Sequence, residues 1–231
     1  MLSENQLKEL HGKEYVELFE SQQSNYRLGR LIKAIKLDAA YKIIDFGCGN
    51  GMLLPFLADR VDRYTGIDFS EEFIKAAERK RRALSIDNAE FICEDILKYC
   101  EINKEYYDVA FAMDFSEHVY DNEWLNILKA IKFSLKDGGK LYIHTPNSEF
   151  FLEKMKKKNF IFKQFPEHIA VRSVKENCDL LKMAGFEVSE INLIPHYNIL
   201  RLLHPISFIP VIGRFFKARI FIELIVRHDG C

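Results

Sequence analysis

A glycine-rich turn follows an apolar stretch early in the chain, in the run Ile43-Ile44-Asp45-Phe46-Gly47-Cys48-Gly49-Asn50-Gly51. Glycine accepts positive φ and lets a ligand approach the backbone, and a helix that opens behind such a turn offers free N–H groups. The spacing is G-x-G-x-G, and Met52 stands where the dinucleotide fingerprint needs its last glycine. The run therefore predicts a ligand-binding turn that departs from the nicotinamide pattern.

Carboxylates follow the ends of successive predicted strands, at Asp45, Asp68, Asp95 and Asp114. Ligands of a parallel sheet bind beyond the carboxyl ends of its strands, and a carboxylate after the second strand suits ribose hydroxyls. Each Asp taken singly has an ordinary role as a strand-end or helix-cap residue. Together, beside a glycine turn, they repel phosphates. This pattern favours an adenosine with a positively charged, phosphate-free tail over a nucleoside triphosphate.

The elements that must position these residues alternate between strand and helix. Ser70 is expected to cap one helix, and Ser173 and Glu176 form a capping box for another. This alternation predicts an α/β fold with a doubly wound, mostly parallel sheet and right-handed crossovers. Strands are expected at 41–46, 64–69, 89–93, 107–113, 140–144, 186–194 and 218–227, and helices from Leu53, behind Ser70, from Asp121 or Trp124 to Leu135, and from Ser173 to Gly185.

Length and composition set further bounds. The chain of 231 residues suffices for one α/β domain with a substantial core, and its formal net charge of −1 argues against a general nucleic-acid binder. Five scattered cysteines without a C-x-x-C pair fit reduced thiols better than a disulfide or zinc framework. The polar N-terminus lacks a signal core, and no apolar run is long enough to span a membrane. We therefore expect a cytoplasmic protein.

The ordered set of motifs resembles the class I S-adenosylmethionine-dependent methyltransferases. Residues Asp45 to Gly51 are similar to the first motif of that family, E/D-x-G-x-G-x-G, and Gly66-Ile67-Asp68 to the acidic end of its second strand. Glu94-Asp95-Ile96 resembles the adenine-side motif, 107–114 the fourth-strand motif, and 136–139 the turn before strand five. The resemblance covers about residues 38–194. It implies a Rossmann-like sheet of seven strands with an antiparallel last strand.

The resemblance also implies roles for the site residues. Asp45 would hold the amino group of the methionine end, Asp68 both ribose hydroxyls, and Asp95 the adenine amine. The methyl group would leave by direct in-line displacement, with S-adenosylhomocysteine as the product. The expected cofactor-binding set is Asp45, Gly47, Cys48, Gly49, Gly51, Asp68, Phe69 (stacking on adenine), Asp95, Ile96 (through its backbone), Met113 and Asp114.

The residues after the fourth strand bear on the substrate. Asp114-Phe-Ser-Glu117 is unlike the Asn-Pro-Pro-Tyr of enzymes that methylate base amines, which argues against a nucleic-acid substrate. Met113 to Val119 instead resembles the M-x-x-x-E-H-V stretch of ubiquinone-type O-methyltransferases and their small-molecule relatives. Phe165 to Ser173 resembles their H-x-x-x-[FY]-[ST] segment, although Arg172 occupies the aromatic position.

His118 and His168 are the candidates for a general base on the acceptor. An alternative is that His118 only fixes its loop by hydrogen bonds, and His144, at the end of strand five, either faces the pocket or is a histidine of the core edge. A third reading is a divalent ion held by Asp114, Glu117 and His118, although this ligand set suits magnesium or manganese only partly.

Two apolar segments are expected to cover the substrate face, at about 145–172 and 195–217, in a domain at 39–231 that follows an N-terminal helical cap at 1–38. Phenylalanines alternate with lysines in 150–165, which suits a greasy or anionic acceptor. The connection 195–217 is long, apolar and aromatic, and Arg201, Arg214, Lys217 and Arg219 lie in it or just after it. It is read as a lid, as a peripheral contact with the inner membrane surface, or as a homodimer contact.

The sequence thus predicts methyl transfer from S-adenosylmethionine to a small-molecule or lipid-like acceptor, at oxygen. A non-catalytic S-adenosylmethionine-binding module and an N- or nucleic-acid methyltransferase are the alternatives.

Overall fold

The computed structural model describes residues 25–157, 169–195 and 205–228. His168 and most of the expected N-terminal cap, including Tyr15 and Phe19, lie outside these ranges.

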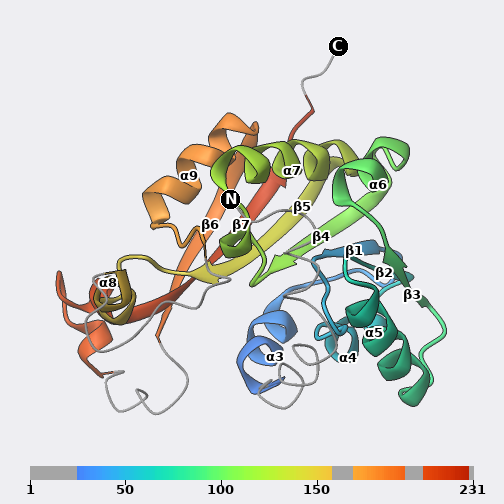
Figure 1. Cartoon of the computed structure of the whole chain (residues 1–231), viewed down its shortest axis with the longest axis horizontal. Coiled ribbons are helices and arrows are strands. Elements are labelled where there is room, and N and C mark those ends of the chain that lie inside the picture. Colours follow the sequence, from blue (N-terminus) through green and yellow to red (C-terminus); the bar gives the residue numbers. More distant parts are fainter. Residues whose placement is uncertain (1–24, 158–168, 196–204, 229–231) are drawn as a thin grey trace.

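One sheet of seven strands runs through the molecule in the order β3-β2-β1-β4-β5-β7-β6 (Figure 1). Strands β1 to β5 pair in parallel with one another, and β7 lies antiparallel between β5 and β6. This confirms the mostly parallel sheet with an antiparallel last strand. The strands are β1 Lys42–Phe46, β2 Arg63–Asp68, β3 Ala89–Cys93, β4 Tyr107–Met113, β5 Leu135–Pro146, β6 Phe186–Pro195 and β7 Lys217–Val226.

Helices cover both faces of the sheet, as a doubly wound fold requires. Helices α6, α7 and α9 lie on one face, and α3, α4 and α5 lie on the other (Figure 1). Short 3-10 turns carry the chain through three of the connections. The bounds are α3 Asn25–Ala34, α4 Leu54–Leu57, α5 Glu71–Ala83, α6 Ile96–Ile102, α7 Asp121–Ser134, α8 Phe151–Lys157, α9 Val174–Met183, η1 Ala58–Arg60, η2 Ser116–His118 and η4 Gly213–Phe216.

Two apolar cores lie on either side of the strands. Successive strand residues point to opposite faces, so Ile44 packs with Trp124 of α7 while its neighbour Ile43 packs with Leu54 of α4. The strands β1 and β4 are buried along nearly their whole length. Strands buried on both faces read as near-continuous apolar runs, which is why the sequence predicts them well.

The helix starts follow the predicted caps in two places. Ser70 accepts a hydrogen bond from the backbone N–H of Phe73 at 3.4 Å, and both bonds of the Ser173–Glu176 capping box are present. Helix α7 begins at Asp121, as expected, and the residue before it, Tyr120, makes no side-chain capping hydrogen bond. The sequence did not predict α6, and β5 begins five residues before the expected start because Leu135 already pairs with Tyr107.

The substrate-face segments are described in part. Helix α8 lies within the expected insertion 145–172, and the described part of 195–217 contains a 3-10 turn at 205–208 and η4. No helix in the described ranges is long and apolar enough to cross a bilayer.

Candidate active site

The four acidic strand ends meet at one edge of the sheet. Strands β3, β2, β1 and β4 are consecutive neighbours, and all four point the same way. Asp45 is the next-to-last residue of β1, Asp68 ends β2, Asp95 is the N-cap of the helix after β3, and Asp114 follows β4. The parallel sheet therefore brings together residues that are far apart in the sequence, at the edge where ligands of such folds bind.

The glycine turn after β1 is built from three residues with positive φ: 66° at Gly47, 52° at Gly49 and 70° at Gly51. A Cβ at Gly47 would come within 2.8 Å of the Phe115 ring, and one at Gly51 within 2.9 Å of the Phe91 ring. Packing inside the protein thus requires glycine at these two positions. At Gly49 the nearest atom to a Cβ would be 3.8 Å away, on Phe73, so this glycine leaves room for a ligand to approach.

Asp68 is held rigidly between the glycine turn and α5. Its Oδ2 accepts a hydrogen bond from the N–H of Gly49 at 3.0 Å, and its Oδ1 accepts one from the N–H of Ser70 at 2.9 Å. Both donors are backbone N–H groups, so they fix the orientation of the carboxylate. A pair of fixed acceptors at a strand end matches a ribose diol.

Asp45 is a buried carboxyl group beside Asp68. The hydroxyl of Tyr64 donates to its Oδ2 at 2.6 Å. Burial raises the pKa of Asp45 to about 7; the charge of Asp68 adds to this, and the bond from Tyr64 opposes it. A cationic ligand group nearby would favour the ionised form of Asp45. Burial also raises the pKa of Cys48 well above its usual range, which disfavours the thiolate form.

Asp95 caps α6. Its Oδ1 accepts hydrogen bonds from the N–H groups of Leu97 at 2.9 Å and Lys98 at 3.2 Å. Both bonds use the same oxygen, which leaves Oδ2 for a ligand. Ile96 is the first residue of the helix, where the N–H has no partner within the helix, and Phe69 is 41% exposed at the end of β2. The assignment of Asp95, Ile96 and Phe69 to the adenine stays a prediction.

Asp114 is the turning point after β4. Its φ is 52°, an uncommon value for a residue other than glycine, and its N–H donates to the carbonyl of His144 at 2.8 Å. Its Oδ1 lies 2.8 Å from Nδ1 of His144 and accepts from Nη1 of Arg219 at 3.0 Å. Met113, before it, is buried. The kink directs the carboxylate toward β5 and β7.

Glu117 adds a second buried carboxyl group to this cluster. The hydroxyl of Thr145 donates to its Oε2 at 3.1 Å, and Nη1 of Arg219 lies 3.7 Å from its Oε1. Burial raises the pKa of Glu117 to about 8; the charge of Asp114 raises it further, and Arg219 lowers it. We call Asp114, Glu117, His144, Thr145 and Arg219 the acid–arginine cluster.

Arg172, which replaces the aromatic residue of the resembled segment, ties down the loop that carries η2. Its guanidinium donates to the carbonyl of Ser116 at 2.7 Å, to the carbonyl of Val119 at 2.6 Å and to Asp121 Oδ1 at 2.8 Å. Only 4% of the residue is exposed. It therefore fixes the backbone around Glu117 and His118 from within the protein.

Two arginines of this region were not predicted as site residues. The partners of Arg172 and Arg219 lie about 50 and 100 positions away in the sequence, so spacing gives no sign of them. Arg219 does lie among the buried apolar residues Ala218, Ile220 and Phe221 of β7, and a cation in such a strand indicates that it has a partner of opposite charge.

The candidate general bases differ in their burial and surroundings. His118 is half-buried at the end of η2, next to Glu117, and its N–H donates to the carbonyl of Phe115 at 3.0 Å. His144 is fully buried against Asp114. His168 lies outside the described residues.

The metal reading finds no support where the structure is described. Within 25–157, 169–195 and 205–228, no group of three His, Cys, Asp or Glu side chains is arranged to hold a metal ion. The guanidinium of Arg219 already brings a positive charge to Asp114 and Glu117. A positive charge of the protein thus lies beside two of the three side chains that were considered as metal ligands.

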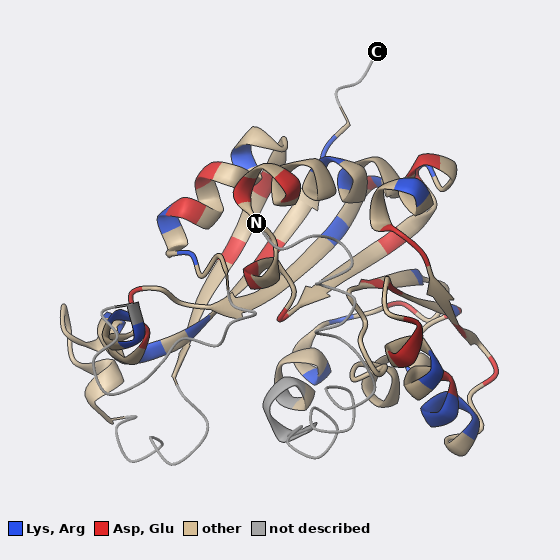
Figure 2. Cartoon of the chain, in the orientation of Figure 1, with Lys and Arg blue, Asp and Glu red and all other residues tan. Residues whose placement is uncertain are grey.

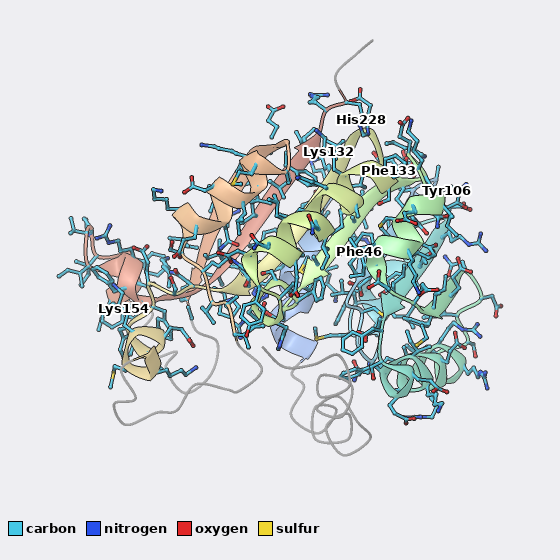
Figure 3. The ribbon with its side chains drawn as sticks, turned by 45° about the horizontal axis from the view of Figure 1, so that its top comes forward. Phe46, Tyr106, Lys132, Phe133, Lys154 and His228 are labelled. Atoms are coloured by element: carbon cyan, nitrogen blue, oxygen red, sulfur yellow. The ribbon has the colours of Figure 1, made fainter. Side chains whose placement is uncertain are left out.

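A shallow charged cleft of about 370 Å³ lies at the opposite edge of the sheet, lined by Lys42, Asp62, Arg63, Asp87, Asn88, Ala89, Glu90 and Tyr106. Figure 3 shows Tyr106 far from Phe46, the last residue of β1. This cleft is at the amino ends of β1 to β3 and is separate from the acidic strand ends.

Comparison with known proteins bears on the family. A family model described as a methyltransferase domain matches residues 19–191. The ubiquinone biosynthesis O-methyltransferase of Idiomarina loihiensis is 33% identical over 106 residues, which is 46% of this chain and 42% of that protein. The enzyme of the same name from Haemophilus ducreyi is 33% identical over 109 residues, 46% of this chain and 45% of that protein. The match thus spans less than half the length of these relatives.

Solved structures share the fold. The magnesium protoporphyrin IX methyltransferase of Synechocystis PCC 6803 with bound SAH has a TM-score of 0.70 at 16% identity, over 97% of this chain and 100% of that one. A putative methyltransferase complexed with the Haloferax volcanii Trm112 activator has a TM-score of 0.71 at 17% identity, over 99% of this chain and 100% of that one. At such identities the likeness shows the fold alone.

Proposed function

The chain belongs to the methyltransferase-domain family, among the class I S-adenosylmethionine-dependent methyltransferases, and we propose that it methylates an oxygen of a small-molecule or lipid-like acceptor. The pair of carboxyl groups at the glycine turn is the observation that best supports binding of S-adenosylmethionine. Asp68 is fixed as a double acceptor, and the buried Asp45 receives its hydrogen bond from the neutral hydroxyl of Tyr64. A ligand with a ribose and a positive charge, but no phosphate, satisfies both.

The proposed cofactor residues each have one task. Asp45 binds the amino group, Asp68 the ribose hydroxyls, and Asp95 the adenine amine through Oδ2. Gly49 allows close approach of the cofactor to the backbone, since a Cβ there would be 3.8 Å from its nearest neighbour. The rest of the proposed set surrounds these four: Gly47, Cys48, Gly51, Phe69, Ile96, Met113 and Asp114. When bound, the cofactor supplies a methyl group on a sulfonium, activated toward a nucleophile.

The chain itself must orient the acceptor oxygen and take its proton. Alignment of the reacting atoms supplies much of the rate enhancement in a direct displacement. His118 and His168 are the proposed bases, of which His118 sits in the loop that Arg172 fixes. Glu117, a member of the acid–arginine cluster, directly precedes His118 in the chain. The cluster would keep this loop in place while the acceptor is bound and released.

Methylation at oxygen is supported by two facts. Met113 to Val119 resembles the corresponding stretch of ubiquinone-type O-methyltransferases, and relatives that carry this name match the chain, although over less than half their length. We propose one of three roles for the connection 195–217: a lid over the acceptor, a contact with the inner membrane surface, or a contact with a second copy of the chain.

Transfer of labelled methyl groups tests the proposal. The protein is incubated with methyl-labelled S-adenosylmethionine and a panel of phenols and hydroxylated lipids, and label is counted in the extracted acceptors. We expect label in at least one acceptor, and a loss of about a hundredfold or more with His118→Ala if His118 is the base. Label that appears only in amines would contradict methylation at oxygen.

One observation favours a second candidate, a module that binds the cofactor without turnover. Asp114 and Glu117 are both engaged by Arg219, and Glu117 also by Thr145, so the carboxyl groups after β4 have structural partners. Binding of S-adenosylhomocysteine together with no label in any acceptor of the panel would favour this candidate.

A further inference from the structure

A cluster of exposed apolar side chains forms a tip before β7, at residues 205–216. Phe208 is 74% exposed, Val211 82%, Ile212 52% and Ile209 48%. Elsewhere in the described ranges, large exposed apolar side chains occur singly along the sequence, which is normal for a protein surface. Contiguous exposed apolar residues instead mark an interaction site.

The tip is an ordered turn. The N–H of Gly213 donates to the carbonyl of Ile209, and that of Ile212 to the carbonyl of Pro210, each at 2.8 Å. Gly213 packs so closely on the backbone of Ser207 that a Cβ would clash. Val211 has a φ of 68°, a costly conformation for a β-branched residue. The backbone thus bears strain in a turn that points apolar side chains outward.

Positive charges surround the apolar side chains. Nζ of Lys154 lies 4.4 Å from the centre of the Phe215 ring, Cζ of Arg214 lies 4.8 Å from the same ring, and Nζ of Lys217 lies 4.7 Å from the Phe208 ring. Figure 2 shows lysine and arginine gathered on α8 and at the start of β7. The acid of α8, Glu153, is buried and paired with Lys156.

Helix α8 and the tip form one unit. The rings of Phe151 and Phe216 pack with centres 5.2 Å apart. In Figure 1 the orange-red segment before β7 lies beside α8, at the end of the molecule away from α5, and Figure 3 labels Lys154 at the same end. Cations from two elements therefore flank one apolar tip.

The tip also belongs to the edge of the sheet that carries the candidate site. Strand β6 runs parallel to β5, because both are antiparallel to β7, so the chain enters this connection at the carboxyl ends of the strands. Two residues after Lys217, Arg219 contacts Asp114. A surface on which the tip rests would face the acceptor side of the protein.

We propose that this tip docks the protein on an anionic phospholipid bilayer. Phe208, Ile209, Val211 and Ile212 enter the interface between headgroups and acyl chains, and Lys154, Arg214 and Lys217 lie at the lipid phosphates. Lysine and arginine with long apolar stems suit this boundary. The inference deepens the proposed function, since a docked bilayer would present a lipid-like acceptor at the site edge.

Flotation with lipid vesicles tests the docking. The full chain is mixed with vesicles of phosphatidylcholine, or of phosphatidylcholine and phosphatidylglycerol in equal parts. We expect it to float with the anionic vesicles and to be released by high salt. The substitution Phe208→Ser/Val211→Ser/Ile212→Ser should weaken binding about tenfold or more. Lys154→Gln/Arg214→Gln/Lys217→Gln should weaken it about fivefold for each charge removed.

Ile102→Ser/Met183→Ser is the matched control, because these apolar residues are 83% and 65% exposed but lie on α6 and α9. The control should float like the wild type. Failure of the wild type to float with anionic vesicles would overturn the proposal, as would an equal loss in the control. A dimer in sedimentation equilibrium that the serine variant breaks, without vesicle binding, would assign the tip to a second copy. Titration of S-adenosylhomocysteine into the same samples measures cofactor binding independently of flotation. The cofactor proposal and the docking proposal can therefore fail separately.

Discussion

Two buried carboxyl groups at the candidate site have pKa values raised toward the physiological range. Both shifts arise mainly from burial, and in each a neighbouring carboxylate adds to the effect. The opposing interactions differ: a neutral tyrosine hydroxyl at Asp45 and a guanidinium at Glu117. Asp45 thus gains most from a positive charge that a ligand brings, whereas Glu117 has one nearby already.

Glu117 should make the protein less stable as the pH rises. Its folded pKa of about 8 lies above the usual value, so between about pH 4.5 and pH 8 the folded state holds a proton that the unfolded state has released. The free energy of unfolding therefore falls across this range and levels off above pH 8. Glu117→Gln cannot ionise, and its stability should fall less between pH 6 and pH 8.5 in urea denaturation.

The matched control for this change is Glu101→Gln, at an exposed position of α6. It should keep the pH dependence of the wild type. An identical fall in stability for the wild type and Glu117→Gln would mean that Glu117 is ionised throughout this range.

The proposed cofactor residues can be selected from the sequence, because they lie in contiguous motifs at predicted strand ends. The acid–arginine cluster cannot, since Arg219 and Thr145 reach Asp114 and Glu117 only after β4, β5 and β7 have paired. The role of glycine at Gly47 and Gly51 is also visible only in the fold, where Phe115 and Phe91 occupy the space of a side chain.

At the scale of secondary-structure elements, Asp95 caps helix α6, and in the proposed function it also binds the adenine amine. Asp95→Asn keeps a good N-cap, because its Oδ1 can accept the same two backbone N–H groups, but it turns an amide donor toward the ligand. We expect nearly unchanged thermal stability and weaker binding of S-adenosylhomocysteine. Asp95→Ala should lose about 1 kcal/mol of stability as well. Equal cofactor affinity in the wild type and both variants would confine Asp95 to the cap.

Substitution of Arg172 tests which contacts hold the η2 loop in place. Arg172→Met leaves the carbonyls of Ser116 and Val119 without this buried donor, and we expect a loss of about 2–4 kcal/mol in the free energy of unfolding. Arg82→Met, at a largely exposed position of α5, should change it by less than about 0.5 kcal/mol. Similar urea midpoints for the two variants would show that the loop is held by other contacts.

The strands were predictable from their apolar residues, whereas the short helix α6 was not. Strands β3 and β4 match their predicted bounds. Helix α6 was missed because its cap, Asp95, was read as the end of a strand, and the helix of α4 lasts only one turn before η1. The position of β7 between β5 and β6 depends on pairing across long sequence distances, which local pattern does not encode.

At the scale of the whole molecule, the carboxyl and amino edges of the sheet carry different groups of residues. The carboxyl edge carries the glycine turn, the acidic strand ends and the acid–arginine cluster, and the proposed membrane tip extends from the same edge (Figure 1). The amino edge carries the charged cleft around Asp62 and Tyr106. Cofactor and acceptor are therefore expected to meet on one side, and the cleft at the other edge provides control positions for substitution.

The most direct measurement is a calorimetric titration of S-adenosylhomocysteine into the wild type, Asp68→Ala and Asp62→Ala. Asp68 lies at the carboxyl edge between the glycine turn and α5, and Asp62 lines the cleft at the amino edge. We predict that the wild type binds, that Asp68→Ala binds about tenfold or more weakly, and that Asp62→Ala binds like the wild type. Absence of binding to the wild type, or an equal loss in both variants, would contradict a cofactor site at the carboxyl edge.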